Sequence, residues 1–426
     1  MSTDPSTASL GRVLLVSHNF PPTLGPESAL VKINTLDLIR RGWKLSVLTT
    51  TMEHMHQTID HGMLDGLPSD LEVIRTPSYD GSLRKRYPRL WTPFLIAIRN
   101  WLLPETFFLW LISCVPAGRR WIHEHGPAII YSRATKHVSN VAGWFLKRAT
   151  GLPWVAHFSD PWQAAKYLGP LQVAIAEWCE HRIFRDADAI VIVNPQLTGE
   201  FATMHPGCEK KLHVIPHGYV PLEKVPPPSA NPGTRPMEAI HAGSFIPGLR
   251  EPHDLFRGLS LLNQRLPLKG LLHITFVGVD TTRYQSFADE LGLHEIVSLL
   301  DSVPYQKCQD MVASSDLLLV LDSPHSGGIY LPTKLIEYLP FEKPVLGLAE
   351  KDSAVHQVLK HCDLTFADQN DPAAIAEVFE QLLKQWQAGT WGVSDLNRER
   401  VLDYRIDRVN EKLHDLLTQL SRTLPA

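Results

Sequence analysis

The most chemically distinctive spacing in the chain is the run Pro332-Thr-Lys-Leu-Ile-Glu337. Proline suits the first turn of a helix, whose free N–H groups and dipole favour an anion such as a diphosphate. Thr333 and Lys334 would offer a hydroxyl and an ammonium to that anion, while Glu337 would accept hydrogen bonds from a ribose diol. Together these groups predict a nucleotide site. The alternative is a surface helix with a common Lys/Glu pair, worth about 0.2–0.5 kcal/mol, and the spacing alone favours that alternative.

The elements that must position these side chains alternate between short apolar strands and helix-length stretches, which is typical of parallel α/β sheets. A helix is expected over 27–41, ended by Gly42. The expected strands are 12–17, 44–49, 128–131, 154–157, 189–193 and 212–215 in the first part, and 238–242, 272–277, 317–320 and 345–348 in the second. Such sheets bind ligands at the carboxyl ends of their strands.

A stretch rich in Pro, Gly and Ser separates the two parts and favours an exposed linker. We therefore expect an N-terminal domain over 1–220, a linker over 221–236, a C-terminal domain over 237–394 and a helical segment over 395–426 that packs back on the body. A chain of 426 residues with 44% apolar residues can bury two such cores.

The composition excludes several classes of protein. The net charge of −4 argues against a nucleic-acid-binding protein. The five cysteines are widely spaced, without a metal-binding pattern, and are interpreted as reduced thiols of a cytosolic protein. The polar N-terminus lacks the features of a secretion signal, so we expect a cytoplasmic location.

An apolar segment over 94–115 is interrupted by charged residues and proline and is too broken to cross a bilayer. Basic and aromatic residues precede it at 84–91 and follow it at 119–121. One interpretation is that residues 84–121 lie on the inner face of a membrane, where basic residues meet anionic headgroups. The other is a pair of core helices flanked by solvated charges.

The run from Pro332 to Tyr338, with Lys343-Pro-Val345 after it, resembles the donor-site helix of glycosyltransferase family 4. The stretch His241-Ala-Gly-Ser-Phe-Ile-Pro-Gly-Leu-Arg250 is similar to the strand exit and following arginine that contact the donor diphosphate in that family. The resemblance assigns Gly243 and Arg250 to the donor site, because glycine permits close backbone approach and arginine donates a fixed fork of hydrogen bonds. The alternative is a plain turn with a solvated arginine.

In the first domain, Asn19-Phe-Pro-Pro-Thr-Leu-Gly-Pro-Glu-Ser28 resembles the phosphate-cradling loop of the family, which implies that Gly25 and Ser28 bind the donor. Pro26 stands where the family has a second glycine and has no N–H to donate. The loop ending at His137 resembles the family's loop that places a histidine beside the transferred sugar. The segment His157-Phe-Ser-Asp-Pro-Trp162, at the next strand exit, resembles a signature of one branch of the family. His137 and Asp160 are therefore the catalytic candidates, the alternatives being a packing histidine and a helix cap.

The family also carries an acidic residue eight positions before Glu337, where this chain has Ile329. This departure suggests that backbone amides of Ser326, Gly327 and Gly328 bind the sugar instead. Motifs that resemble the family occur in the expected order from Val13 to about Leu348.

The resemblance implies the α/β fold called GT-B, with two doubly wound Rossmann-like domains facing across a cleft. It implies transfer of a sugar from a nucleotide diphosphate to a glycan or lipid-linked acceptor, with retention of anomeric configuration, no metal and no other cofactor, in surface polysaccharide or glycoconjugate synthesis. An epimerase or hydrolase of nucleotide sugars and a catalytically inactive scaffold remain alternatives.

Overall fold

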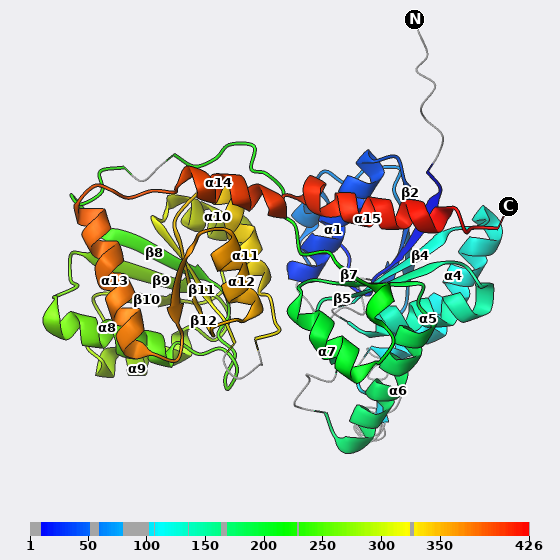
Figure 1. Ribbon diagram of the computed structural model, residues 1–426, viewed down its shortest axis with the longest axis horizontal. Coiled ribbons are helices and arrows are strands. Elements are labelled where there is room, and N and C mark those ends of the chain that lie inside the picture. Colours follow the sequence, from blue (N-terminus) through cyan, green and yellow to red (C-terminus); the bar gives the residue numbers. More distant parts are fainter. Residues whose placement is uncertain are drawn as a thin grey trace, which may run out of the picture. The chain divides into compact units, whose positions relative to one another are not determined.

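The computed structural model divides into two units, Met1–Gly218 with Ile406–Ala426 and Tyr219–Arg405, which are described separately (Figure 1). It describes residues 10–51, 59–79, 102–105, 107–134, 136–162, 168–227, 230–323 and 328–425.

Within the described residues, the first unit contains a sheet of seven parallel strands in the order β3-β2-β1-β4-β5-β6-β7. The strands are β1 Arg12–Val16, β2 Lys44–Thr50, β3 Glu72–Thr76, β4 Ile129–Ala134, β5 Trp154–Phe158, β6 Ala189–Ile192 and β7 Leu212–Val214. The helices are α1 Pro26–Arg40, α4 Leu111–His125, α5 Val138–Thr150, α6 Pro170–Asp186, α7 Gln196–Met204 and α15 Ile406–Ser421. The central strands are apolar and buried because helices cover both faces of a parallel sheet.

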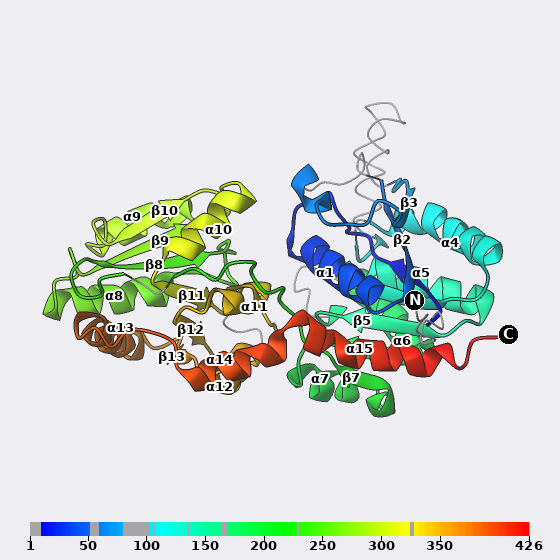
Figure 2. The ribbon, with the colours of Figure 1, turned by 90° about the horizontal axis from the view of Figure 1, so that it is seen from above.

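The two faces of this sheet are covered by different helices (Figure 2). Val13 and Leu15 pack with Val31 of α1 and Leu413 of α15, which lie side by side. On the opposite face, α4 approaches so closely that a Cβ on Gly118 would lie 3.0 Å from Leu48. Alternation along β1 and β2 thus divides their side chains between two cores.

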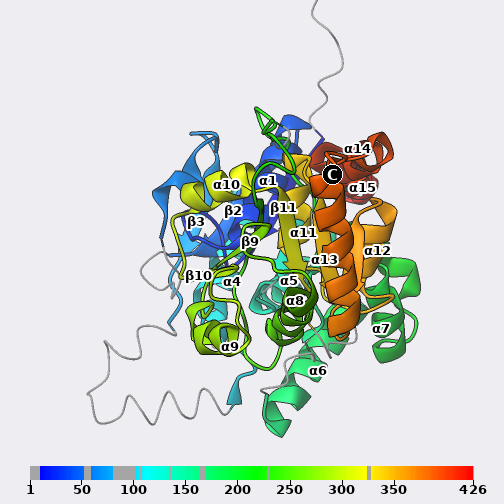
Figure 3. The ribbon, with the colours of Figure 1, turned by 90° about the vertical axis from the view of Figure 1, so that its left-hand side faces the viewer.

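The second unit contains, within its described residues, a sheet of six parallel strands in the order β10-β9-β8-β11-β12-β13. The strands are β8 Met237–Ala242, β9 Leu272–Val277, β10 Val297–Leu300, β11 Leu317–Leu321, β12 Val345–Ala349 and β13 Thr365–Asp368. The helices are α8 His253–Arg265, α9 Gln285–Glu290, α10 Tyr305–Ser314, α11 Thr333–Tyr338, α12 Ala354–His361, α13 Pro372–Gln387 and α14 Asp395–Val401. Helices α8 and α13 pack together on one face (Figure 3), while α11 and α12 pack on the other.

The predicted strands are present, with bounds that differ by one to three residues at some ends. The strands that the sequence patterns did not predict, β3, β10 and β13, all lie at edges of the two sheets. An edge strand has fewer covered neighbours, so its sequence carries a weaker apolar signal than that of a central strand.

The segment predicted as one helical stretch after residue 395 is interrupted at Arg405, where α14 and a short 3₁₀ turn end. The backbone N–H of Tyr219 donates to the carbonyl of Tyr404 over 2.9 Å, and Tyr219 and Arg405 pair as an isolated β-bridge. This pairing engages backbone groups that a continuous helix would use itself. Helix α15 then begins at Ile406 and buries Val409 and Leu413 in the first unit.

The apolar segment near residue 100 lies partly outside the described residues, which exclude 80–101 and 106. From Trp110 onward it packs into the first unit, where Trp110, Cys114 and Trp121 are buried. Among the described helices, none is both long enough and apolar enough to cross a bilayer.

Candidate active site

In the second unit, two cations lie close to His241 at the carboxyl end of β8. The pKa of His241 is lowered to about 4, mainly by burial and in addition by the positive charges of Arg250 and Lys334, although the hydrogen bond to Leu319 raises it. His241 Nδ1 lies 3.0 Å from the carbonyl of Leu319 and must donate to it, so Nε2 carries a lone pair. Nε2 is buried and has no hydrogen-bond partner among the described residues. The structure therefore gathers Arg250 and Lys334 around a neutral histidine.

The guanidinium of Arg250 is mostly buried and incompletely paired. Its Nη2 donates to Ser323 Oγ over 3.3 Å, whereas its Nε has no partner within the described part of the chain. Burial lowers the pKa of Arg250 and the nearby Asp322 raises it, but a guanidinium stays charged in proteins. Burial has the opposite effect on the Asp322 carboxyl group and raises its pKa to about 6. A buried cation with an unused donor is suited to an anionic ligand.

Lys334 and Glu337 form an ion pair with 2.7 Å between Nζ and Oε2, and both side chains are about one-third exposed. Burial alone would lower the pKa of Lys334, but the Glu337 carboxylate outweighs it and the pKa ends above its usual value. The pair has the geometry of the common helical pair that the spacing also allowed. Its place beside His241 distinguishes it from a solvated pair, because a ligand at His241 would lie within reach of Lys334.

Helix α11 is held to β8 by Tyr338, whose hydroxyl accepts a hydrogen bond from the backbone N–H of Ala242 over 2.8 Å. The helix begins at Thr333 and is only six residues long, so its dipole is weak. The side chains of α11 and their distance from β8 therefore matter more than the helix terminus.

Of the predicted sugar-binding residues before α11, the structure describes only Gly328. Ser326 and Gly327 lie outside the described residues. Gly328 has a φ of 68°, and a Cβ there would lie 2.8 Å from the Cβ of Ser353. Packing against α12 thus gives Gly328 a structural reason, independent of any ligand.

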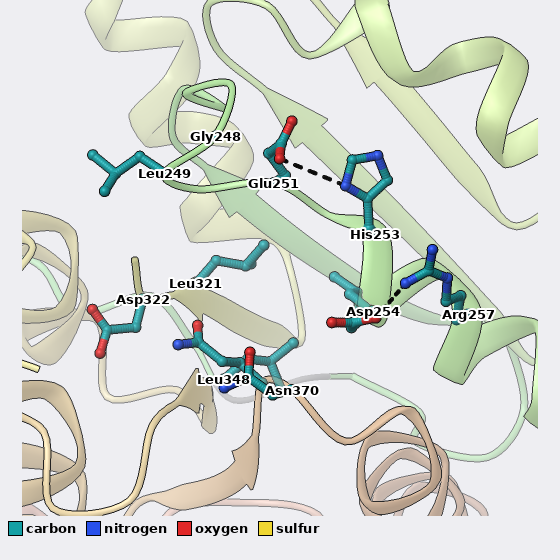
Figure 4. Close-up of a pocket in the computed structure, with 12 residues that line it drawn as sticks. Gly248, Leu249, Glu251, His253, Asp254, Arg257, Leu321, Asp322, Leu348 and Asn370 are labelled. Carbon is teal, nitrogen blue, oxygen red and sulfur yellow. Dashed lines mark hydrogen bonds and ion pairs between the residues drawn. The ribbon is translucent and has the colours of Figure 1, made fainter. Parts of the chain in front are cut away.

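A cavity of about 270 Å³ opens between the loop after β8 and the carboxyl ends of β11, β12 and β13 (Figure 4). Its polar lining includes Asp322, the Glu251–His253 pair at 3.8 Å and the Asp254–Arg257 pair at 2.7 Å. Leu249, which also lines it, directly precedes Arg250. The cavity and the cation cluster are therefore neighbours on one edge of the sheet.

In the first unit, the loop between β1 and α1 contains Gly25 and Ser28. Gly25 has a φ of 153° and open space where a Cβ would be. Ser28 Oγ is buried and has no partner among the described residues. Beside them, Glu27 accepts from Arg133 Nε over 3.2 Å, and both of these side chains are buried. This ion pair fixes the start of α1 to the end of β4.

His137 lies at the start of α5, where its backbone N–H donates to Glu105 Oε1 over 2.9 Å and that of Val138 donates to Oε2 over 3.0 Å. Burial raises the pKa of Glu105 to about 7 and lowers that of His137 to about 3, so the imidazole is neutral at physiological pH. The ring of His137 stacks on Trp162, with centroids 4.8 Å apart and planes 10° apart. Its Nδ1 has no partner among the described residues.

Asp160 follows β5 and lies near the start of α1. Burial and, to a lesser degree, the negative charge of Glu27 raise its pKa to about 7. The structure therefore brings Gly25, Ser28, His137 and Asp160 together at the carboxyl edge of β1, β4 and β5, as adjacent parallel strands require.

Several polar residues at these edges were not among the predicted site residues. They are Glu27, Glu105, Arg133, His241 and Asp322. Arg133 and His241 gave a usable signal, since each lies near the carboxyl end of a mostly buried strand, where a polar side chain needs a partner. Among the described residues, no group of three or more His, Cys, Asp or Glu side chains is placed to hold a metal.

Comparison with known families supplies an independent observation. Residues 37–218 match a family model described as a glycosyl transferase 4-like domain. This part of the chain is a glycosyl transferase 4-like domain. It contains His137 and Asp160, whereas Gly25 and Ser28 precede the matched region. No curated protein sequence matches the chain as a relative.

Solved structures match both the glycosyl transferase 4-like domain and the unit that follows it. The sucrose-phosphate synthase of Thermosynechococcus elongatus has a TM-score of 0.69 at 16% identity, over 97% of this chain and 100% of that one. HepE of Anabaena, solved in complex with UDP-glucose, has a TM-score of 0.64 at 15% identity, over 96% and 100%. The lipopolysaccharide outer core galactosyltransferase WaaB has a TM-score of 0.59 at 14% identity, over 96% and 99%. At these identities the similarity shows the fold, which is GT-B.

Proposed function

We propose that this chain is a glycosyltransferase that moves a sugar from a nucleoside diphosphate to a hydroxyl group of a glycan or lipid-linked acceptor, with retention of anomeric configuration. The observation that carries the proposal is the cluster of Arg250 and Lys334 around neutral His241, in a chain with a glycosyl transferase 4-like domain. A diphosphate leaving group develops negative charge as the sugar departs, and preorganised cations stabilise that charge.

The cavity beside Arg250 is the proposed place for part of the donor. Its lining of carboxylates with Asn370 suits the hydroxyl groups of a sugar, which both donate and accept. Its volume of about 270 Å³ lies below the usual range for drug-sized ligands. It therefore suits one ring of the donor rather than the whole molecule.

In the first unit, His137 and Asp160 are the proposed contacts to the transferred sugar or the acceptor. Neutral His137 offers Nδ1, and Asp160 offers a carboxyl group whose pKa of about 7 lets it gain or lose a proton near physiological pH. We propose that no metal takes part, since Arg250 and Lys334 supply the positive charge at the diphosphate.

Binding and turnover test the proposal separately. We expect UDP or another nucleoside diphosphate and its sugar ester to raise the melting temperature, since a ligand at 100 times its Kd adds about 2.7 kcal/mol. UDP-glucose is the first probe, because HepE was solved with it. Lys334→Ala should abolish the shift, while Lys384→Ala, on an exposed face of α13, should leave it unchanged.

The product then identifies the reaction. Transfer to an added glycan or lipid-linked acceptor, with the donor's anomeric configuration kept in the NMR spectrum, supports the proposal. Acceptor-independent turnover would indicate a hydrolase or epimerase instead, and the absence of binding by any nucleotide sugar would indicate an inactive scaffold. Flotation with anionic vesicles tests whether residues 84–121 attach to a membrane surface, which is one of the two interpretations of this segment.

A further inference from the structure

A buried carboxylate of α6 holds the loop that follows β5. Glu180 is fully buried, and its Oε2 accepts a hydrogen bond from the backbone N–H of Trp162 over 3.0 Å. The bond joins a helix to a loop residue two positions after Asp160. Because a buried carboxylate is costly unless its oxygens are hydrogen-bonded, the partners of Glu180 restrict its orientation strongly.

The other oxygen of Glu180 is anchored by His205, which in turn contacts His181. His205 Nε2 lies 2.9 Å from Glu180 Oε1, and His205 Nδ1 lies 3.3 Å from His181 Nδ1. An ionised Glu180 can only accept, so His205 Nε2 donates to it. In a neutral His205 the Nδ1 atom then accepts the hydrogen bond from His181. The ring of His205 also stacks on Phe184, with centroids 4.1 Å apart. The carboxylate is thus fixed from both sides.

The loop held by Glu180 in turn holds His137. The ring of Trp162 is buried and lies nearly parallel to that of His137 at 4.8 Å. A chain of contacts therefore runs from His205 through Glu180 and the backbone of Trp162 to the imidazole of His137. Its members lie directly after α7, in α6, in the loop after β5 and directly before α5, so no local segment holds the imidazole by itself.

We propose that Glu180 is a positioning residue for His137 and Asp160. It acts through the backbone of Trp162 and touches neither donor nor acceptor. The proposal rests on the proposed function in that His137 and Asp160 serve the transfer. Misplacement of a catalytic group by about 1 Å can cost on the order of a hundredfold in rate, so a positioning defect appears in kcat.

Variants on α6 separate positioning from stability. Glu180→Ala removes both acceptors. In Glu180→Gln, the amide oxygen still accepts from the Trp162 N–H. The amide NH2 group can donate to His205 Nε2 if His205 takes the tautomer with its proton on Nδ1, so we expect this variant to behave like the wild type. Asp186→Ala is the matched control, because Asp186 accepts from the indole of Trp144 over 2.8 Å at the other end of the same helix.

The first measurement needs no activity: NMR of protein labelled with ¹³C-histidine, in which the His137 ring signal is the one lost in His137→Asn. Stacking on Trp162 should place this signal upfield. We expect it to move downfield in Glu180→Ala and to stay in Glu180→Gln and Asp186→Ala. An unmoved signal in Glu180→Ala overturns the proposal. Should that variant not fold, His205→Phe, which keeps the stack on Phe184, must move the same signal.

The second measurement is turnover. We expect kcat to fall about tenfold to a hundredfold in Glu180→Ala, with the donor KM and the nucleotide Kd unchanged. Equal losses in Glu180→Ala and Asp186→Ala would indicate a general packing effect and overturn the proposal. A wild-type protein that binds nucleotide without transfer counts against the proposed function, and the His137 signal still decides the role of Glu180.

Discussion

The imidazole of His241 lies directly against Gly243, so that a Cβ on Gly243 would come within 2.8 Å of His241 Nε2. The ring has little freedom to move, because Nδ1 is bonded to the Leu319 carbonyl and the ring plane lies 8° from that of Phe245. The imidazole of His241 therefore fills the position at the end of β8 that a side chain on Gly243 would need. That position adjoins the two cations of the proposed donor site.

Gly243→Ala should weaken nucleotide binding about tenfold or more, because overpacking costs about 1–3 kcal/mol and displaces His241. Isothermal titration calorimetry measures the Kd. The double variant with His241→Ala removes the clash, and we expect it to recover most of the binding that Gly243→Ala loses. Equal losses in the single and double variants would show that the Gly243 backbone, and not the contact with His241, matters.

Arg250→Ala should lower kcat by about a hundredfold to a thousandfold, the usual loss when a preorganised charge donor is removed. Arg250→Lys should recover little, since an ammonium lacks the planar fork of donors. Arg257→Ala is the control, because Arg257 lines the cavity beside Arg250 but is half-exposed and paired with Asp254. Steady-state kinetics with the identified donor decide, and equal effects of Arg250→Ala and Arg257→Ala would contradict the role assigned to Arg250.

The pH profile should carry a limb near 7 from Asp160, whose pKa is raised to about 7 by burial and by Glu27. The carboxylate accepts from an acceptor hydroxyl more readily than the neutral acid, so we expect kcat/KM to fall as the pH drops below 7. Asp160→Asn should flatten this limb. Glu105→Gln should leave it in place, although the pKa of Glu105 is also about 7. His137, with a pKa of about 3, contributes no limb above pH 5.

The raised pKa of Asp160 also predicts how stability depends on pH: stability should fall as the pH rises, whereas activity should increase. A carboxyl group whose folded pKa exceeds its ordinary value of 3.8 favours the folded state fully below pH 3.8 and loses this contribution as the pH rises through 7. Urea unfolding at pH 5 and pH 8 should therefore show a smaller pH dependence in Asp160→Asn than in the wild type. An unchanged pH dependence would contradict the raised pKa.

Asp316 should be a main contributor to the stability of the second unit. This buried carboxylate accepts from Arg235 Nη1 over 2.7 Å, Arg235 Nη2 over 2.8 Å and the Glu238 N–H over 2.9 Å. Asp316→Asn should cost about 1–3 kcal/mol, because one acceptor becomes a donor facing other donors. Glu295→Gln should cost clearly less, because its pair with Lys269 is exposed to solvent, which screens the attraction. Urea unfolding compares the two, and similar costs would contradict the prediction.

The proposed donor-side residues could be predicted from the sequence because they lie in short, ordered motifs. Gly243, Arg250, Lys334 and Glu337 follow strands whose apolar patterns are strong, and a parallel sheet brings its strand ends to one edge. The spacing could not decide whether Lys334 and Glu337 bind a ligand or only each other. That depends on how close α11 lies to β8, which the hydrogen bond between the Tyr338 hydroxyl and the backbone N–H of Ala242 fixes by joining the two motifs in space.

The first unit shows more clearly which contacts the sequence could not predict. Its partners are far apart in the sequence: Glu27 with Arg133, Glu105 with His137, and Glu180 with Trp162. Such pairs leave no local pattern, because each bond depends on packing between separate elements. The pKa values of these groups depend on the burial that the packing creates.

The sequence by itself determined the alternation of strands and helices, the two-part organisation and the order of the motifs, since these follow from local apolar patterns and turn residues. The tertiary structure decided which polar groups meet, which of them remain without partners and which lose their charge at physiological pH. These properties arise from burial and from contacts between distant segments, and no stretch of sequence contains them alone.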